Sequence, residues 1–227
     1  MKNILIVGLV VLTLLSGCKE QQKTAIEKVG TPATALSIPE QIANANGFTN
    51  WKKVNNIKFT FNVDRESSHF ERSWSWAPKS NDVVFMTRED TIKYNRKAVD
   101  TVLAKTDAGF VNDKFWLLAP YQLVWDKNSY TYKHQASATA PMSQTAMQKL
   151  TIVYGNEGGY TPGDAYDFYF GDDFVIKEWA FRKGNQEEPN MVTSWEDYQD
   201  FNGLSIATMH KRSDEDFKLY FTGVSVE

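Results

Sequence analysis

The chain has 227 residues and a formal net charge of −3 at pH 7, and aromatic residues make up 14% of it. The mildly acidic balance argues against a nucleic-acid partner, which normally presents itself as a basic surface. A single cysteine excludes an intrachain disulfide, so the fold must be stabilised by its own core. The aromatic content suits a β-rich core.

A cleavable export signal is expected at the N-terminus. Lys2 precedes an apolar run over Ile4–Leu15, which is shorter than the roughly 20 residues that cross a bilayer as a helix. Residues 15–18 read Leu-Ser-Gly-Cys and resemble the lipobox of bacterial lipoproteins, in which the cysteine is acylated and the chain is cut before it. The resemblance implies a signal peptide over residues 1–17 and lipid on Cys18. An ordinary cleaved signal with an unmodified Cys18 is the alternative.

The expected partner of Cys18 is therefore a membrane. One acyl chain gives only marginal binding, and bacterial lipoproteins usually carry two or three chains, palmitate among them. Lys19 follows the cysteine in place of the aspartate associated with inner-membrane retention in some bacteria. This favours the outer membrane of a Gram-negative bacterium. Residues 18–35 are polar and lack an apolar face, so we expect a flexible tether between lipid and domain.

A single domain is expected over residues 36–227, which contain no convincing internal repeat. It begins with a short helix. Ser37 suits the N-cap, Pro39 suits the first turn and Gly47 suits the exit from the helix. The remainder of the domain is dominated by a period of two, which indicates half-buried strands.

About nine to eleven antiparallel strands are expected, because turn residues separate the alternating segments and no helix lies between the later ones. Asn202-Gly203 is the strongest hairpin signal, and 171–173 and 183–185 are further turn candidates. The segments with strand periodicity are Ile57–Val63, Phe70–Trp76, Val83–Met86, Ile92–Tyr94, Leu150–Tyr154, Tyr166–Phe170, Val175–Phe181, Thr193–Phe201, Leu204–His210 and Phe217–Phe221.

One segment has a helical pattern instead. Asp107–Ala119 predicts a helix that Pro120 ends. Phe115 and Leu118 lie on one apolar face and Trp116 lies on another, so we expect this helix to be buried on more than one side. The polar stretch Lys133–Gln148 reads as a long loop or a weak second helix.

The order of these elements resembles the half-barrel fold shared by the periplasmic lipoprotein carrier and its outer-membrane receptor. Residues 112–120 (Asn-Asp-Lys-Phe-Trp-Leu-Leu-Ala-Pro) and 158–166 (Gly-Gly-Tyr-Thr-Pro-Gly-Asp-Ala-Tyr) also resemble a bacterial lipoprotein family of similar length that has no established activity. The resemblance to this family covers nearly the whole mature chain. The resemblance to the carriers rests on the order of the elements and implies a mainly β (α+β) fold, a single curved antiparallel half-barrel sheet with one or two helices on its concave side. The carriers are soluble, whereas this chain is expected to be tethered, which favours a receiving or holding role.

No catalytic residue, metal or cofactor is expected. His69, His134 and His210 lie in three separate segments without the paired spacing of a metal site. No nucleophile elbow, P-loop or EF-hand loop occurs in the sequence.

The aromatic residues are the best candidates for binding a hydrophobic ligand, although a plain core role is the default for any one aromatic residue on a strand. A concave sheet covered by an apolar helix encloses an apolar space, and such spaces bind ligands. Tyr160 and Asp164 are expected at its rim, with a tight turn around Pro162-Gly163 as the structural alternative. The expected wall residues are Phe61, Trp74, Trp76, Phe115, Trp116, Leu118 and Trp179.

Two function classes remain open. The first is a membrane-tethered monomer that binds an acyl chain or lipid in an apolar cavity. The second is a structural or interaction module of the cell envelope, with a filled core and no ligand. The volume of the cavity beneath the helix separates them, since several hundred Å³ of apolar space supports binding.

Overall fold

The computed structural model describes residues 35–157 and 161–227, and Leu36–Glu227 forms one compact unit. The predicted signal peptide, Cys18 and nearly all of the predicted tether lie outside the described residues, as does Tyr160.

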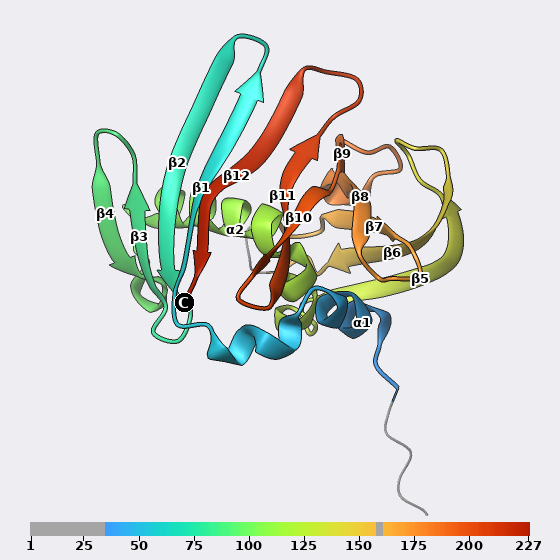
Figure 1. The fold of residues 1–227 in the computed structure, drawn as a ribbon, viewed down its shortest axis with the longest axis horizontal. Helices are drawn as coiled ribbons and strands as arrows, with labels where there is room; N and C mark the ends of the chain where they lie inside the picture. The colour runs from blue at the N-terminus through green and yellow to red at the C-terminus, as the bar shows by residue number, and fades with distance from the viewer. Residues whose placement is uncertain (1–34, 158–160) are drawn as a thin grey trace, which may run out of the picture. The chain divides into compact units, whose positions relative to one another are not determined.

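Within the described residues twelve strands, slightly more than the expected nine to eleven, form two open antiparallel sheets, which confirms the mainly β half-barrel fold class (Figure 1). We expected a single sheet, but the strands form two separately hydrogen-bonded sheets. The larger has the order β10-β11-β12-β1-β2-β3-β4 and the smaller the order β5-β6-β7-β8-β9. The larger sheet comprises β1 (Ile57–Arg65), β2 (Ser68–Ala77), β3 (Asp82–Met86), β4 (Thr91–Asn95), β10 (Glu196–Phe201), β11 (Leu204–Lys211) and β12 (Phe217–Val226). The smaller comprises β5 (Tyr130–Thr139), β6 (Ala146–Tyr154), β7 (Ala165–Phe170), β8 (Ile176–Arg182) and β9 (Met191–Ser194).

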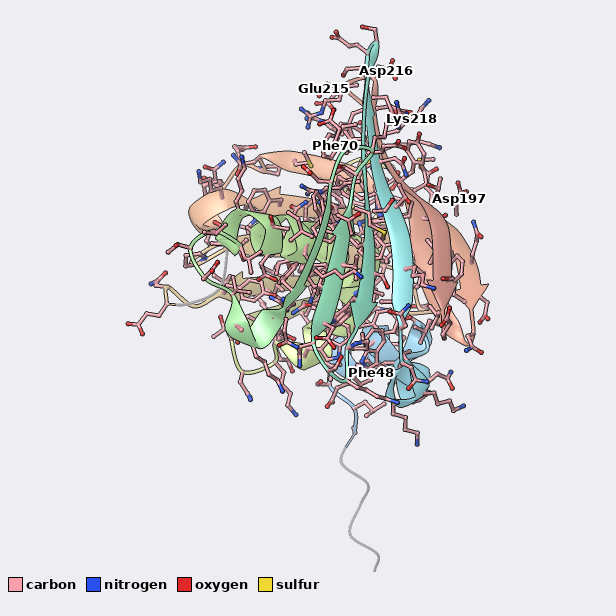
Figure 2. The ribbon with its side chains drawn as sticks, turned by 90° about the vertical axis from the view of Figure 1, so that its left-hand side faces the viewer. Phe48, Phe70, Asp197, Glu215, Asp216 and Lys218 are labelled. Carbon is pink, nitrogen blue, oxygen red and sulfur yellow. The ribbon has the colours of Figure 1, made fainter. Side chains whose placement is uncertain are left out.

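The long strands of the larger sheet project at one end. Figure 2 shows Phe70 and Asp216 toward this end and Phe48 at the opposite end, near helix α1 (Ile38–Ala45). Phe48 begins the short 3₁₀ helix η1 (Phe48–Lys53), and two further 3₁₀ turns are η2 (Arg96–Ala98) and η3 (Lys183–Asn185).

Helix α1 begins as its sequence predicts. The Ser37 backbone N–H donates to the Glu40 carboxylate at 2.9 Å, which satisfies an amide that a helix start leaves without an intrahelical partner. Pro39 lies in the first turn, and Gly47 follows the helix with a φ of +84°. The Ser37, Pro39 and Gly47 predictions are confirmed.

Helix α2 (Ala104–Trp125) is longer than predicted, and the expectation that Pro120 ends it is wrong. Pro120 has no N–H to donate and crowds the preceding turn, so the helix distorts at Leu118 (φ −127°, ψ 24°) and then continues. Packing explains why the chain does not turn away. Tyr121 and Leu123, beyond the proline, are both fully buried.

The strand at Thr193–Phe201 is two strands. β9 pairs with β8, β10 pairs with β11, and Trp195 lies between them, so this segment crosses from one sheet to the other. At the crossing the Lys211 backbone N–H donates to the Ser194 hydroxyl at 3.1 Å. The β10–β11 hairpin has a two-residue turn with positive φ at both Asn202 (58°) and Gly203 (84°), which confirms the hairpin prediction.

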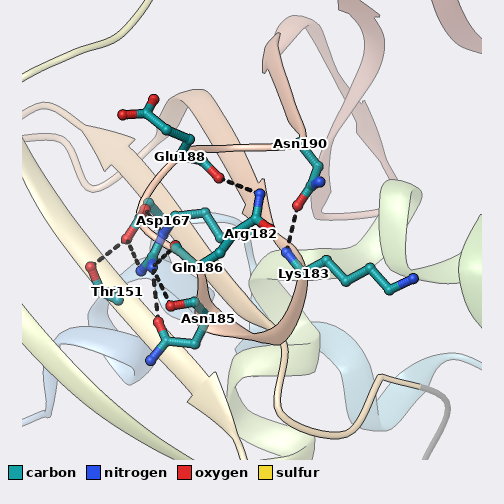
Figure 3. A network of polar contacts seen from close by, with 8 residues as sticks. All are labelled: Thr151, Asp167, Arg182, Lys183, Asn185, Gln186, Glu188 and Asn190. Atoms are coloured by element: carbon teal, nitrogen blue, oxygen red, sulfur yellow. Dashed lines mark hydrogen bonds and ion pairs between the residues drawn. The ribbon is translucent and has the colours of Figure 1, made fainter.

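The interpretation of Lys133–Gln148 as a loop or weak helix is wrong, since most of it belongs to β5 and β6. β5 is an edge strand with mostly exposed or half-buried side chains, so its composition is polar. A register shift between Gln135 and Ala138 breaks its alternation further. The smaller sheet is consolidated on one face by Asp167, which accepts hydrogen bonds from Thr151 and from Arg182 Nε at 2.8 Å (Figure 3).

Candidate functional site: an apolar cavity beneath helix α2

A cavity of about 870 Å³ lies between helix α2 and both sheets. This is within the range of pockets that hold small-molecule ligands. The larger sheet contributes β1 and β12, and the smaller contributes β6, β7, β8 and β9. The apolar wall of the cavity consists of Phe61, Val63, Ala108, Val111, Phe115, Trp116, Tyr166, Trp179, Phe181, Met191, Phe217 and Leu219.

Strand alternation explains how β1 and β8 present these side chains. Phe61 and Val63 are two residues apart on β1, as are Trp179 and Phe181 on β8, so each pair points to the same face of its sheet. Arg182 follows Phe181 and points to the other face, where it meets Asp167 at 2.8 Å (Figure 3). The cavity side of these strands is therefore aromatic, and their outer side has the Asp167–Arg182 ion pair beside a small apolar cluster that includes Tyr169 and Ala180.

Helix α2 supplies the covering aromatic residues. The Trp116 ring lies 4.5 Å from that of Trp179, and Phe115 lies 4.9 Å from Tyr166, measured between ring centroids. These contacts join the helix to β8 and β7. Phe115 and Trp116 are neighbours on the helix and both border the cavity, as expected for a helix buried on more than one side.

Four of the seven predicted wall residues border the cavity: Phe61, Phe115, Trp116 and Trp179. Whether these four contact a ligand stays a prediction. Trp74, Trp76 and Leu118 were expected in the wall of the cavity, but the structure places them outside it.

The two tryptophans pack against helix α2, and Leu118 is a buried residue of α2 itself. Trp74 and Trp76 contact Phe110 of α2 at 5.4 and 5.6 Å between ring centroids, so that ring covers both indoles. The Trp74 Nε1–H donates to Asp113 at 2.8 Å. Leu118 is completely buried at the distorted turn of α2. All three are core residues.

The predicted rim residue Asp164 also has a structural role. Its Oδ1 accepts a hydrogen bond from the Gly184 N–H at 2.7 Å, and its backbone carbonyl accepts one from Tyr154 at 2.9 Å. Asp164 therefore holds the start of β7 to turn η3 and does not border the cavity. Glu157 and Thr161, from the same loop, do border it, and neither was predicted as a site residue.

A polar part of the cavity wall was not predicted from the sequence. Lys114 and Gln122 of α2 border the cavity, and Lys114 Nζ donates to Gln122 Oε1 at 2.5 Å. Asp126, which follows α2, accepts a hydrogen bond from the Tyr154 hydroxyl at 2.9 Å, and both residues border the same cavity. Burial lowers the pKa of Lys114 to about 8 and raises that of Tyr154 well above its ordinary value. The signal that could have revealed this region is the adjacent charged pair Asp113-Lys114 in the middle of an otherwise apolar helix segment.

The three histidines remain dispersed over separate strands. His69 on β2 lies 2.6 Å from Asp64, His134 on β5 lies 3.0 Å from Gln148, and His210 on β11 is completely buried. Within residues 35–157 and 161–227, no three His, Cys, Asp or Glu side chains gather as metal ligands would. No helix in that part of the chain has the length and apolar character needed to cross a membrane.

No protein-family model and no curated protein matches the sequence. Solved structures do match in fold. The LolA superfamily protein NE2245 from Nitrosomonas europaea aligns with a TM-score of 0.51 and 7% identity, covering 84% of this chain and 92% of that one. A domain from Vibrio parahaemolyticus, described as an outer membrane lipoprotein-sorting protein, aligns with a TM-score of 0.50 and 9% identity over 84% of this chain and 91% of its own. The fold is therefore similar to that of the LolA superfamily, as the sequence resemblance implied.

Proposed function

We propose that this protein holds an acyl chain or another lipid-like ligand in the cavity beneath helix α2. The observation that carries the proposal is the cavity itself, about 870 Å³ with a largely aromatic and aliphatic wall. Each methylene transferred from water into such a site contributes about 0.8 kcal/mol, so a long acyl chain is the ligand that gains most. The alternative of a filled core receives no support from a cavity of this size.

The fold gives secondary support. One of the solved structures with this fold is described as a lipoprotein-sorting protein. The name of that protein indicates that it handles a polypeptide with attached lipid. Holding is favoured over shuttling here, because the proposed lipid on Cys18 would confine the protein to a membrane surface.

The cellular arrangement proposed is a signal peptide over residues 1–17, a lipidated Cys18, a tether and a single domain over 36–227 in the outer membrane. Replacing Cys18 by Ser removes the acylated thiol while leaving the domain unchanged. We expect Cys18→Ser to move the protein from the membrane fraction to the soluble periplasmic fraction. Unchanged membrane retention of this variant would contradict the anchor.

Ligand binding is tested best by filling the cavity rather than by emptying it. Val111 of α2 borders the cavity, whereas Val102, shortly before the helix, is 83% exposed. Val111→Trp inserts an indole into the proposed binding space, and Val102→Trp makes the same change in solvent. We expect the first variant to lose at least tenfold in affinity for a fluorescent fatty acid, and the second to bind like the wild type.

The fold of both variants is checked by circular dichroism and thermal unfolding. Equal binding by the two folded variants would show that the probe binds elsewhere and would overturn the proposal. Absence of any binding by the wild type would leave the interaction module as the better explanation. Native mass spectrometry of the domain purified without its anchor provides a second readout, since a retained lipid adds its own mass.

A further inference from the structure

Lys114 is a buried cation at the surface of the cavity. Its exposed fraction is 5%, and its Nζ lies 5.1 Å from the ring centroid of Trp125 and 5.5 Å from that of Trp76. One hydrogen bond, to Gln122, engages the ammonium group. Among the residues that the structure describes, no carboxylate oxygen lies within 4.0 Å of Nζ. The ammonium therefore has aromatic faces and one amide around it, but no ion-pair partner.

The neighbouring charged groups are engaged with other residues. Asp107, on the same helix, forms an ion pair with Arg96 of η2 at 2.7 Å. Asp126 accepts the hydrogen bond of Tyr154 from β6. Burial has the largest influence on Lys114 and lowers its pKa to about 8. The charge of Arg96 lowers this pKa further, whereas the charges of Asp126 and Asp107 raise it. At pH 7 the side chain is thus mostly protonated, and a buried charge of this kind is stabilised strongly by a counter-ion.

The ammonium and the aromatic wall belong to the same cavity. Lys114 and Phe115 are consecutive residues of α2 and both border it. Gln122, Ser129 and Tyr154 add hydrogen-bonding groups to the wall, whereas Trp116 and Trp179 add apolar surface. A cavity with a large apolar wall and a buried cation that has no ion-pair partner is complementary to an amphiphile with one charged end.

We infer that the cavity binds a single-chain amphiphile whose compact anionic group, a carboxylate or a phosphate, pairs with Lys114 Nζ. This inference rests on the proposed function and specifies its ligand class. The acyl chain would lie against Phe115, Trp116 and Trp179, and the anion would approach Gln122. Arg96 is a weaker candidate for this role because Asp107 already pairs with it. Arg65 is exposed, with its guanidinium 5.1 Å from the Phe217 ring centroid, so water competes for its charge.

The test compares three probes that share one chain length: dodecanoate, methyl dodecanoate and dodecyl phosphate. Each probe displaces a fluorescent apolar dye from the wild type, from Lys114→Met and from Lys105→Met. Lys105 is an exposed lysine of the same helix, so its variant loses the same charge without affecting the cavity. Methionine keeps the length and apolar stem of lysine, which limits the loss of packing.

We expect the wild type and Lys105→Met to bind one or both anions about tenfold more tightly than the methyl ester, as a charge-assisted hydrogen bond would provide. Lys114→Met should bind all three probes with similar affinity. A preference for dodecanoate would identify fatty acids as the ligand class, and a preference for dodecyl phosphate would identify phosphorylated lipids.

If Lys114→Met does not fold, the comparison of the anions with the ester in the wild type still tests the inference. Equal affinity of the wild type for the ester and both anions would overturn the inference while leaving the proposed function standing. Failure to bind any of the three probes would overturn both. A preference for anions that persists undiminished in folded Lys114→Met would assign the anion to another residue and would also overturn the inference.

Discussion

The indole of Trp116 lies 4.5 Å from that of Trp179, with the two planes inclined by 59°. On its other side Trp116 faces His210 at 5.2 Å between ring centroids. Because Trp179 belongs to β8 and His210 to β11, this one helical side chain contacts both sheets. Trp116 also borders the cavity, so it is part of both the core and the proposed binding wall.

Truncating Trp116 should therefore affect both folding and binding, whereas truncating Trp74 should affect folding alone. We expect Trp116→Ala and Trp74→Ala each to lower the free energy of unfolding by about 3–5 kcal/mol. Only Trp116→Ala should weaken binding of a fluorescent fatty acid, since Trp74 lies outside the cavity wall. Urea unfolding and probe titration, at a temperature where both variants are folded, check this. Equal losses of affinity in the two variants would contradict it.

Asp113 is expected to be the most sensitive charged residue of the helix. Its carboxylate is completely buried and accepts hydrogen bonds from Arg72 Nε at 2.5 Å and from Trp74 Nε1 at 2.8 Å. Asp113→Ala leaves Arg72 without its counter-ion, and we expect a loss of about 3–5 kcal/mol in unfolding free energy. The control is Asp64→Ala, which breaks a half-exposed contact with His69 and should cost less than about 1 kcal/mol. Similar costs for the two variants in urea would refute the prediction.

His210 should make stability depend on pH. Burial lowers its pKa from 6.5 to about 3, although the hydrogen bond to the Ser194 carbonyl and the nearby Glu196 charge act in the other direction. Below pH 6.5 the unfolded chain gains a proton at this site that the folded chain does not, so acid favours unfolding. From pH 6.5 down toward 3, His210 should reduce the free energy of unfolding by up to about 1.4 kcal/mol per pH unit.

Urea unfolding at several pH values between 7 and 4 measures this slope. His210→Phe should flatten it, because phenylalanine does not titrate. The control is His69→Gln. The hydrogen bond to Asp64 raises the pKa of exposed His69, so the contribution of His69 to the pH dependence of stability has the opposite sign to that of His210. An unchanged slope in His210→Phe would show that other groups govern the acid sensitivity.

A side chain at position 47 is expected to destabilise the fold. It has a φ of +84°, and a Cβ built there would lie 2.1 Å from the Gly203 carbonyl oxygen. Gly184 also has positive φ, but its Cβ would meet nothing within 4 Å. Gly184→Ala should cost about 1–2 kcal/mol from backbone conformation alone. Gly47→Ala should cost about 1–3 kcal/mol more because of the clash. Thermal or urea unfolding of the two variants compares them directly, and equal losses would exclude the clash as a cause.

The strands with a clear apolar period were predictable, and the exceptions have physical reasons. β5 could not be recognised because an edge strand with little buried surface needs few apolar residues, and its register shift interrupts the alternation. Pro120 was predicted to end the helix, but it only distorts the helix locally at Leu118. Burial of Tyr121 and Leu123 outweighs the lost hydrogen bond, and sequence alone does not report that tertiary gain.

The candidate site was predictable in outline only. Apolar side chains on a helix indicate which residues are buried but not whether they face a cavity or a neighbouring ring. Phe115 and Trp116 therefore could not be distinguished from Leu118, nor Phe61 from Trp74, before the register of β1 and β2 was known. Lys114 was missed because a lysine is usually exposed, and its burial depends on the position of Trp76 and Trp125.

Pairing of β1 with β12 places the first and last strands of the domain together at the middle of the larger sheet. Ile57 is opposite Val226, so the centre of the larger sheet cannot form until β12 is available to pair with β1. Contacts between residues so distant in sequence also form slowly. The larger sheet therefore cannot be completed from local hairpins such as β10–β11 alone, and we expect its folding rate to be limited by the pairing of β1 with β12.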